Sequence, residues 1–422
     1  MSGVQHQSFR LNEMQSLMRR CSKLAPYNFI HALRMAVPAD GRRWRDAAEQ
    51  TVAELGLGAP RFDGDRVRFV SAFPVSVETP QGSLDNHLDS EMNRPFSSDE
   101  LPFRFFVIEE ADGTHWFGVV IDHWLADDYS CRQLLHRICL RYYSPEKAVT
   151  LPVLECADAP SQRHFRTVLR ALPGLAKQFA SHRRAFRVSL RDPLDFAVRT
   201  FQQKLPIGLI DTIRRRAKEY NATVHDCFLM AAAQACGEFR RSHFRGPRQS
   251  IAVATVVDLR RFVDRGIAMA TAFGCFLGYY TLAISNPEES PALGLIKGIA
   301  LRTKLLKTQM RGTQGALILA RIWWDHSRSD CAKATLFQRG IPLMCGLSNV
   351  NLTGSWIDGT VPRLLDYRRV GPTGPITPLV FMITSISDRL SIDVTYRTTA
   401  FTQGDAEFLA DRFITRLNSL VA

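Results

Sequence analysis

The 422-residue chain contains no run of about 18 uninterrupted apolar residues, the minimum for a membrane-spanning helix. Its first residues, MSGVQHQSFRLNEMQ, lack the basic and then apolar pattern of a secretory signal peptide. Its nine cysteines form no C-x-x-C pair, and their odd number does not indicate a disulfide framework. We therefore expect a cytoplasmic protein with no metal site, in which most cysteines are buried free thiols.

Acidic residues are missing from two long stretches, 163–191 and 290–324, in a chain with a formal net charge of +13. In the first stretch apolar residues recur at helical spacing, which places the basic residues on other faces, and Pro173-Gly174 breaks or kinks that helix. The basic faces are either simply solvated or meet an anionic partner. That partner is a phosphate-bearing cofactor, an acidic carrier protein or a membrane surface. We expect no nucleic-acid partner, because no known nucleic-acid-binding module is recognisable.

The length exceeds what one hydrophobic core usually organises, so we expect two domains or two fused halves. A composition of 45% hydrophobic and 23% charged residues is typical of folded globular proteins. The patterns predict an α/β fold with a first half over residues 1–175 and a second over 176–422. A basic helical segment, roughly 160–191, joins them.

In the first half, two alternating apolar runs, 103–110 and 115–122, flank Asp112-Gly113, which predicts a β-hairpin. A helix over 131–143 follows the hairpin, since apolar residues recur there at helical spacing. Earlier in this half we expect helices over 11–24 and 43–56 and a strand over 28–37.

The second half ends like the first, with a hairpin, a loop and a helix, although the histidine loop is replaced by TTAFTQGD. This suggests two similar halves, of which only the first carries the histidine. The segment GPTGPITP (371–378) predicts a rigid loop, because it is rich in glycine and proline. The elements expected in this half are helices over 207–220, 223–241 and 406–421 and strands over 250–259, 274–284, 342–352, 379–386 and 390–397.

The segment VVIDHWLADDYS (119–130) places His123 just past the end of the first hairpin. A histidine there can take or give a proton near neutral pH. Asp127 either caps the following helix or pins the loop through an arginine. A purely structural interpretation also fits, with His123 bonded to backbone and Asp127, Asp128 and Ser130 as capping candidates. The spacing alone favours this structural interpretation, because such spacings occur by chance, but a hairpin before the loop and a helix after it shift the balance toward chemistry.

DHWLADDYS resembles the H-x-x-x-D loop of the chloramphenicol acetyltransferase-like superfamily, which includes nonribosomal peptide condensation domains and wax ester synthases. LNEMQ is similar to the opening helix of that family, and NATVHDCFLMAAAQA to the helix that opens its second half. VVDLRR, GCFLGYY and LSNVN are similar to its later strands. The resemblance covers nearly the whole chain and is nearest to stand-alone condensation-domain-like acyltransferases.

The resemblance implies a V-shaped pair of similar halves with the active site in a tunnel at the seam. His123 would deprotonate or orient an amine or alcohol, on a small molecule or a carrier, as it attacks a thioester carbonyl. The donor would be a coenzyme A or phosphopantetheine thioester, the latter on an acyl carrier protein supplied in trans, with no permanently bound cofactor. Asp127 would be structural and paired with an arginine; Arg260 is our candidate and Arg261 the second choice.

Further residues are candidates for the tunnel or for stabilising the oxyanion. Ser348 and Asn349 offer polar groups at a strand end, although a turn that ends the strand is the better explanation of them from the sequence. Tyr279 lies in an apolar strand and is either tunnel lining or plain core. Asp128 and Ser130 complete the set. We expect a monomer, and contact of 163–191 with an anionic membrane surface stays open.

The loop departs from the family's common H-H-x-x-x-D-G pattern at two positions. Asp122 replaces the first histidine, and Asp128 replaces a glycine that allows a tight turn. Some family members with aspartate there are inert platforms that recruit other proteins. The pattern His123, Asp127, Ser130 also resembles terminal condensation domains that release or cyclise chains. An acyltransferase is therefore the preferred hypothesis, and a catalytically inert platform that recruits a partner protein is the alternative.

Overall fold

The chain divides into two compact units, each assembled from separate segments of the sequence. The predicted boundary at residue 175 differs from this division, because two later segments group with the first unit. One of them adds an edge strand to its sheet, and the other hydrogen-bonds to the loop of His123. Unit 1 comprises Met1–Ser161, Asp258–Leu277 and Gly354–Val370; unit 2 comprises Gln162–Val257, Gly278–Thr353 and Gly371–Ala422.

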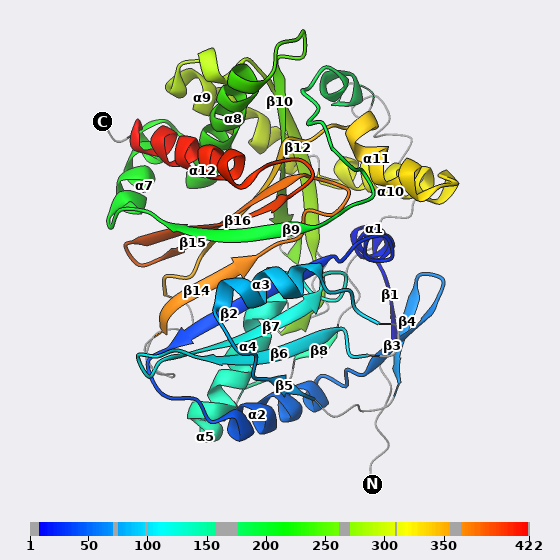
Figure 1. The fold of residues 1–422 in the computed structure, drawn as a ribbon, viewed down its shortest axis with the longest axis vertical. Helices are drawn as coiled ribbons and strands as arrows, with labels where there is room; N and C mark the ends of the chain where they lie inside the picture. Colours follow the sequence, from blue (N-terminus) through cyan, green and yellow to red (C-terminus); the bar gives the residue numbers. More distant parts are fainter. Residues whose placement is uncertain are drawn as a thin grey trace. The chain divides into compact units, whose positions relative to one another are not determined.

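These units come from a computed structural model of the whole chain (Figure 1). Arg261 and most of the basic stretch 163–191 lie outside the residues that it describes. The described residues are 8–70, 75–97, 100–149, 151–152, 154–156, 176, 178–260, 271–308, 310–354 and 364–420.

Unit 1 contains a mixed five-stranded sheet built around the predicted hairpin. The hairpin turns at Gly113, whose φ of +77° suits glycine, while the Asp112 carboxylate accepts a hydrogen bond of 3.0 Å from the Thr114 amide. All neighbouring strands are antiparallel except the last two. In order across the sheet the strands are β14 (Leu364–Val370), β2 (Asn28–Met35), β7 (His115–Asp122), β6 (Phe103–Glu109) and β5 (Val77–Glu78).

Aromatic packing fixes helices against this sheet. The buried Trp44 ring stacks 3.9 Å from Phe117 of the sheet and 3.9 Å from Tyr142 of the helix that follows the hairpin. Two small sheets, ordered β1-β4-β3 and β11-β8, complete the unit. Its helices are α1 (Glu13–Ser22), α2 (Gly41–Glu54), α3 (Leu84–Asn93), α4 (Asp128–Tyr143) and α5 (Pro145–Ala148); its other strands are β1 (Ser8–Arg10), β3 (Ala59–Asp63), β4 (Arg66–Val70), β8 (Glu155–Cys156) and β11 (Ala272–Phe273).

Unit 2 contains a six-stranded mixed sheet with helices packed on it. In order across the sheet the strands are β12 (Leu277–Ser285), β10 (Ser250–Asp258), β13 (Cys345–Asn351), β15 (Leu379–Ile386), β16 (Arg389–Arg397) and β9 (Val198–Lys204). The helices are α7 (Leu209–Glu219), α8 (Val224–His243), the 3-10 turn η2 (Pro287–Glu289), α9 (Ala292–Thr308), α10 (Met310–His326), α11 (Asp330–Gly340) and α12 (Gln403–Asn418). The ring centroid of Phe413 in α12 lies 5.1 Å from that of Phe381 in the sheet and 6.4 Å from that of Phe228 in α8, so the three elements share one core.

The predicted echo between the two halves is present. In unit 1 the hairpin of β6 and β7 leads into α4, and in unit 2 the hairpin of β15 and β16 leads into α12 (Figure 1). A side-chain oxygen caps each of these helices, from Asp127 in the first case and Thr402 in the second.

One predicted strand is shorter than expected. The run 274–284 becomes strand only from Leu277, because Gly274 and Phe276 direct backbone groups to the loop of His123 instead. Burial of the cysteines is as expected, since Cys331 alone is exposed among the cysteines whose side chains are described. Within the described ranges, no helix combines the length and apolar content needed to cross a bilayer.

Candidate active site

His123 lies in the short connection between β7 and α4, and backbone hydrogen bonds hold this connection at both ends. The His123 amide donates to the Tyr27 carbonyl at 3.1 Å, and the Leu125 amide donates to the Asp122 carbonyl at 2.9 Å. At the other end the Asp127 amide donates to the Gly274 carbonyl at 3.1 Å. The histidine is therefore carried on a fixed turn rather than on a long free loop.

The His123 imidazole is held as a neutral base. Its Nδ1 lies 3.2 Å from the Ala126 carbonyl oxygen, which can only accept, so Nδ1 carries the proton and Nε2 keeps its lone pair. Within the described part of the chain, Nε2 has no hydrogen-bond partner. The ring stacks on Phe29 at 4.7 Å and on Tyr27 at 6.0 Å. Burial lowers the pKa of His123 below its ordinary value, so the ring is unprotonated at neutral pH.

Asp127 both caps α4 and pairs with an arginine, so the two roles left open by the sequence coexist. Its Oδ1 accepts from the Ser130 amide at 2.9 Å and from Arg260 Nη2 at 3.1 Å. Its Oδ2 accepts from Arg260 Nη1 at 2.7 Å and from the Phe276 amide at 2.8 Å. Asp127 is 1% exposed and Arg260 6% exposed, so this is a buried, two-pronged ion pair. The predicted pairing of Asp127 with Arg260 is present, and both residues belong to unit 1.

The Ser130 hydroxyl joins the same network. It donates to the Gly274 carbonyl at 2.8 Å and accepts from the Gly274 amide at 3.0 Å and from Arg260 Nη2 at 2.7 Å. Its one hydrogen and both lone pairs are thus occupied, and the residue is fully buried. This arrangement favours support of the loop over the oxyanion role that we expected for Ser130.

The Asp128 carboxylate is neutralised by two arginines. Its Oδ2 lies 2.8 Å from Arg132 Nε, and its Oδ1 lies 2.6 Å from Arg369 Nε and 3.5 Å from His31 Nε2. Burial alone would raise the pKa of Asp128, but the charges of Arg369 and Arg132 outweigh burial and hold this pKa well below its usual range. Burial also lowers the pKa of His31 to about 3, so His31 is neutral. The negative charge that Asp128 adds, where the family's common pattern has glycine, is therefore paired with arginines.

Aromatic rings connect this cluster to His123. The Phe29 and His31 rings meet edge to face with their centroids 4.4 Å apart, and the Phe29 ring also stacks on His123. His31 Nδ1 also hydrogen-bonds to the Tyr367 hydroxyl. Sequence reasoning missed His31, Tyr367 and Arg369, because they lie on β2 and β14, whose pairing joins segments more than 300 residues apart. The one local signal is a histidine inside the apolar run NFIHALRM.

Asp122, at the family's first histidine position, faces the interior of unit 1. Trp124 Nε1 donates to its Oδ2 at 2.7 Å. Burial raises the pKa of Asp122 to about 7, despite the stabilising hydrogen bonds from Trp124 and Ser22. The residue next to His123 in sequence is therefore a carboxyl that changes charge near neutral pH.

The other candidates, Ser348, Asn349 and Tyr279, belong to unit 2. The Asn349 side chain accepts from His225 Nδ1, while His225 Nε2 lies 3.1 Å from the Thr255 hydroxyl. Ser348 lies beside Asn349 on β13, which pairs in parallel with β15. Tyr279 is half-buried against a small apolar cluster, and burial raises its pKa, so its hydroxyl stays protonated. The role of these three residues at His123 stays a prediction.

Solved structures with the same fold include condensation and epimerization domains and an acetyltransferase. The trichothecene 15-O-acetyltransferase TRI3 from Fusarium sporotrichioides has a TM-score of 0.71 at 12% identity, over 98% of this chain and 96% of that one. The epimerization domain from the third module of tyrocidine synthetase B gives 0.69 at 13%, over 100% and 97%. The first condensation domain of the CDA synthetase gives 0.66 at 15%, over 99% and 96%. No known family model matches the sequence, and no curated protein matches it.

At these identities the likeness shows the fold alone. The chain has the α/β fold of condensation domains and of the chloramphenicol acetyltransferase-like proteins, as the sequence predicted. Coverage of nearly the full length of these structures means that both units take part in the likeness. The V-shaped arrangement and the tunnel at the seam stay predictions.

Proposed function

We propose that the chain is an acyltransferase of the condensation-domain type. It moves an acyl group from a coenzyme A or carrier-protein thioester to an amine or alcohol, with His123 as the general base. The observation that carries the proposal is the His123 ring, a neutral imidazole whose Nδ1 is bonded to the Ala126 carbonyl and whose Nε2 lone pair is left for a substrate. The fold supports it, because the structures that share this fold include an acetyltransferase and condensation domains.

In the proposed reaction Nε2 of His123 takes the proton of the attacking amine or alcohol as that group adds to the thioester carbonyl. The Ala126 carbonyl, which accepts from Nδ1, stabilises the imidazolium that forms. The carbon–sulfur bond then breaks, and the imidazolium returns its proton to the leaving sulfur. A positioned base accounts for roughly 10²–10⁴-fold acceleration. The remainder of the rate enhancement comes from holding both substrates in place, with Ser348 and Asn349 as candidates for stabilising the oxyanion.

Asp127 and Arg260 support the base in this proposal without touching the substrate. Their ion pair fixes the first turn of α4 and the segment around Gly274 and Phe276, which together hold the backbone on either side of the loop. Asp127 is directed into this network and, among the described residues, makes no hydrogen bond to the His123 ring. We therefore assign it a positioning role.

The acid-free stretch 290–324 supports a negatively charged donor. In α9 the outward-facing leucines Leu293 and Leu301 are 43% and 71% exposed, and the exposed Lys297 and Lys304 lie among them. A face that combines leucines with lysines suits a partner that is both acidic and apolar, as the helices of an acidic carrier protein are. The phosphates of coenzyme A would pair with the lysines but would leave the leucines without an apolar partner. An anionic membrane surface is the third option, which sedimentation with anionic vesicles at physiological salt tests.

The alternative, an inert platform that recruits a partner protein, draws on Asp128. Two arginines fix its carboxylate, so the first turn of α4 is braced by charges where the family's common pattern has a flexible glycine. Such bracing serves a rigid docking surface as well as it serves a catalytic loop. The two hypotheses separate on turnover.

The test is release of free thiol and formation of acylated product from acyl-coenzyme A and from an acylated carrier protein, each offered with amine and alcohol acceptors. We expect turnover with one donor class and its loss in His123→Ala. His326→Ala, which removes an exposed histidine, is the matched control and is expected to keep full activity. Activity retained in His123→Ala removes His123 as the base. No turnover of any thioester by the wild-type chain supports the platform.

A further inference from the structure

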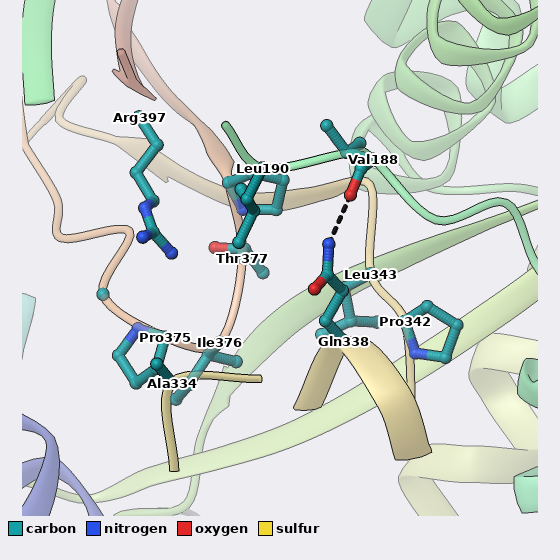
Figure 2. A pocket seen from close by; sticks show the side chains of 12 residues that line it. Val188, Leu190, Ala334, Gln338, Pro342, Leu343, Pro375, Ile376, Thr377 and Arg397 are labelled. Atoms are coloured by element: carbon teal, nitrogen blue, oxygen red, sulfur yellow. Dashed lines mark hydrogen bonds between the residues drawn. The ribbon is translucent and has the colours of Figure 1, made fainter. Parts of the chain in front are cut away.

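Unit 2 contains a hollow that the proposed reaction at His123 does not use (Figure 2). The hollow opens to solvent, and its walls are mostly apolar. One wall is the predicted rigid loop 371–378, which turns at Gly374 with a φ of +53°. The lining residues are Val188, Leu190, Ala334, Gln338, Pro342, Leu343, Gly374, Pro375, Ile376, Thr377, Pro378 and Arg397.

Arg397 is the one charged residue in this lining. It ends β16, is only 2% exposed, and its guanidinium points toward the space bordered by Thr377 and Pro375 (Figure 2). Its Nε donates to the Asp195 carbonyl at 3.2 Å, and its Nη2 donates to the Asp195 and Pro193 carbonyls at 2.6 and 3.0 Å. These acceptors are neutral backbone oxygens, and the charge is stabilised further by the Phe196 ring, 4.2 Å from the guanidinium carbon, and at longer range by the Asp195 and Asp192 carboxylates.

Of the five N–H hydrogens of the Arg397 guanidinium, the two on Nη1 are not used by these bonds. Within the part of the chain that the structure describes, Nη1 of Arg397 has no acceptor, and no carboxylate lies within 4.0 Å of the guanidinium. Burial lowers the pKa of Arg397 to about 10, which leaves it protonated at neutral pH. A buried cation with spare donors is costly unless an anion completes it.

The other polar side chains of the lining are already engaged or uncharged. Gln338 donates its amide to the Val188 carbonyl (Figure 2), so it closes the wall opposite Arg397 instead of reaching inward. Leu190 and Ile376 are half-buried and present aliphatic surface to the hollow. A matching ligand therefore has one anionic end for Arg397 and a short apolar body for these walls.

We propose that this hollow binds a small aliphatic carboxylate, with the carboxylate on Nη1 of Arg397 and the hydrocarbon against Leu190 and Ile376. The site lies wholly within unit 2 and stands independently of acyl transfer at His123. Since a carboxylate can accept two hydrogen bonds from one guanidinium, both spare hydrogens of Nη1 would be used.

Titration calorimetry of the full chain with 3-methylbutanoate, and with the uncharged 3-methylbutanamide as its isostere, tests the proposal. We expect the carboxylate to bind about tenfold or more tightly than the amide, because a charge-assisted hydrogen bond is lost with the amide. Leu190→Trp keeps the arginine but fills the hollow, and it is expected to abolish binding. Arg199→Gln removes an exposed arginine from the neighbouring strand β9 and is expected to leave binding unchanged.

Arg397→Gln is expected to remove the preference for carboxylate over amide. It also weakens the bonds to the 192–195 backbone, so if this variant fails to fold, Leu190→Trp decides. Equal binding of carboxylate and amide, wild-type affinity in Leu190→Trp, or no binding by the wild-type chain overturns the proposal. Thiol release by the wild type and by His123→Ala is unaffected by any of these outcomes, so this inference and the proposed function fail separately.

Discussion

Replacing Asp127 by alanine removes the carboxylate on which the His123 loop is built. Four hydrogen bonds are lost together: two to Arg260, one to the Ser130 amide and one to the Phe276 amide. The pair is buried, so solvent does not replace these bonds. The Arg260 charge is left between the rings of Tyr129 and Phe276, at 4.5 and 4.4 Å, with the half-exposed Asp258 as its remaining carboxylate at 3.3 Å.

Removing one partner of a buried ion pair costs about 3–5 kcal/mol, and losing a helix N-cap costs about 1 kcal/mol. Because Asp258 still meets Arg260, we expect the lower part of this range for Asp127→Ala, about 3 kcal/mol in the free energy of unfolding. Asp258→Asn is the matched control. Its carboxylate is 42% exposed, so its contribution is expected to be below about 1 kcal/mol.

Urea unfolding, followed by far-ultraviolet circular dichroism and by tryptophan fluorescence, measures these changes if the two signals coincide. A double-mutant cycle with Arg260→Ala isolates the pair. We expect the double variant to be more stable than the sum of the single losses predicts, by about 1 kcal/mol or more, because Arg260→Ala removes the charge that Asp127→Ala leaves uncompensated. A loss below 1 kcal/mol in Asp127→Ala, or strict additivity in the cycle, would refute the reasoning.

Three further predictions follow from the residues around His123. The rate of acyl transfer at limiting substrate is expected to fall as the pH is lowered, with its midpoint below the 6.5 of an ordinary histidine, since burial lowers the pKa of His123 and the neutral ring is the base; a midpoint above pH 7 would contradict this. Asp122→Asn is expected to stabilise the chain increasingly between pH 4 and pH 7, and by on the order of 4 kcal/mol above pH 7. The reason is that the folded pKa of Asp122, about 7, exceeds the ordinary 3.8, so ionisation of this carboxyl opposes folding. Thermal unfolding of both chains as a function of pH measures the difference in stability, and a pH-independent difference would refute the prediction. Asp128→Gly, which restores the family's common residue, is expected to destabilise the chain by about 1–3 kcal/mol, because it strips the carboxylate from the fully buried Arg369; equal or higher stability by urea unfolding would count against that pairing.

The hairpin and helix around the loop were predictable, because their signals are local. Asp112-Gly113 between alternating runs fixes the turn, and Asp127 before an apolar helical pattern gives the cap. The residues alone left Asp127 with two roles, and the choice of Arg260 came from the family resemblance. In the structure one carboxylate has enough lone pairs to fill both roles.

The remainder of the site depends on pairings that no local pattern encodes. Arg369 and Tyr367 reach the loop because β14 pairs with β2, and a seven-residue strand carries no mark of its partner. Gly274 and Phe276 read as the start of a strand, yet their backbone groups bond to Asp127 and Ser130, since buried side chains compete for them. Sequence patterns predict elements, whereas these contacts arise only when distant elements meet.

The central claim is that His123 is a neutral imidazole with its proton on Nδ1. Nitrogen-15 NMR of the histidine-labelled chain, with His123→Ala to identify the signal, measures this directly. At pH 7 we predict a protonated Nδ1 and an unprotonated Nε2, with the ring titrating below pH 6.5. A proton on Nε2, or a fully protonated ring at pH 7, would contradict the account.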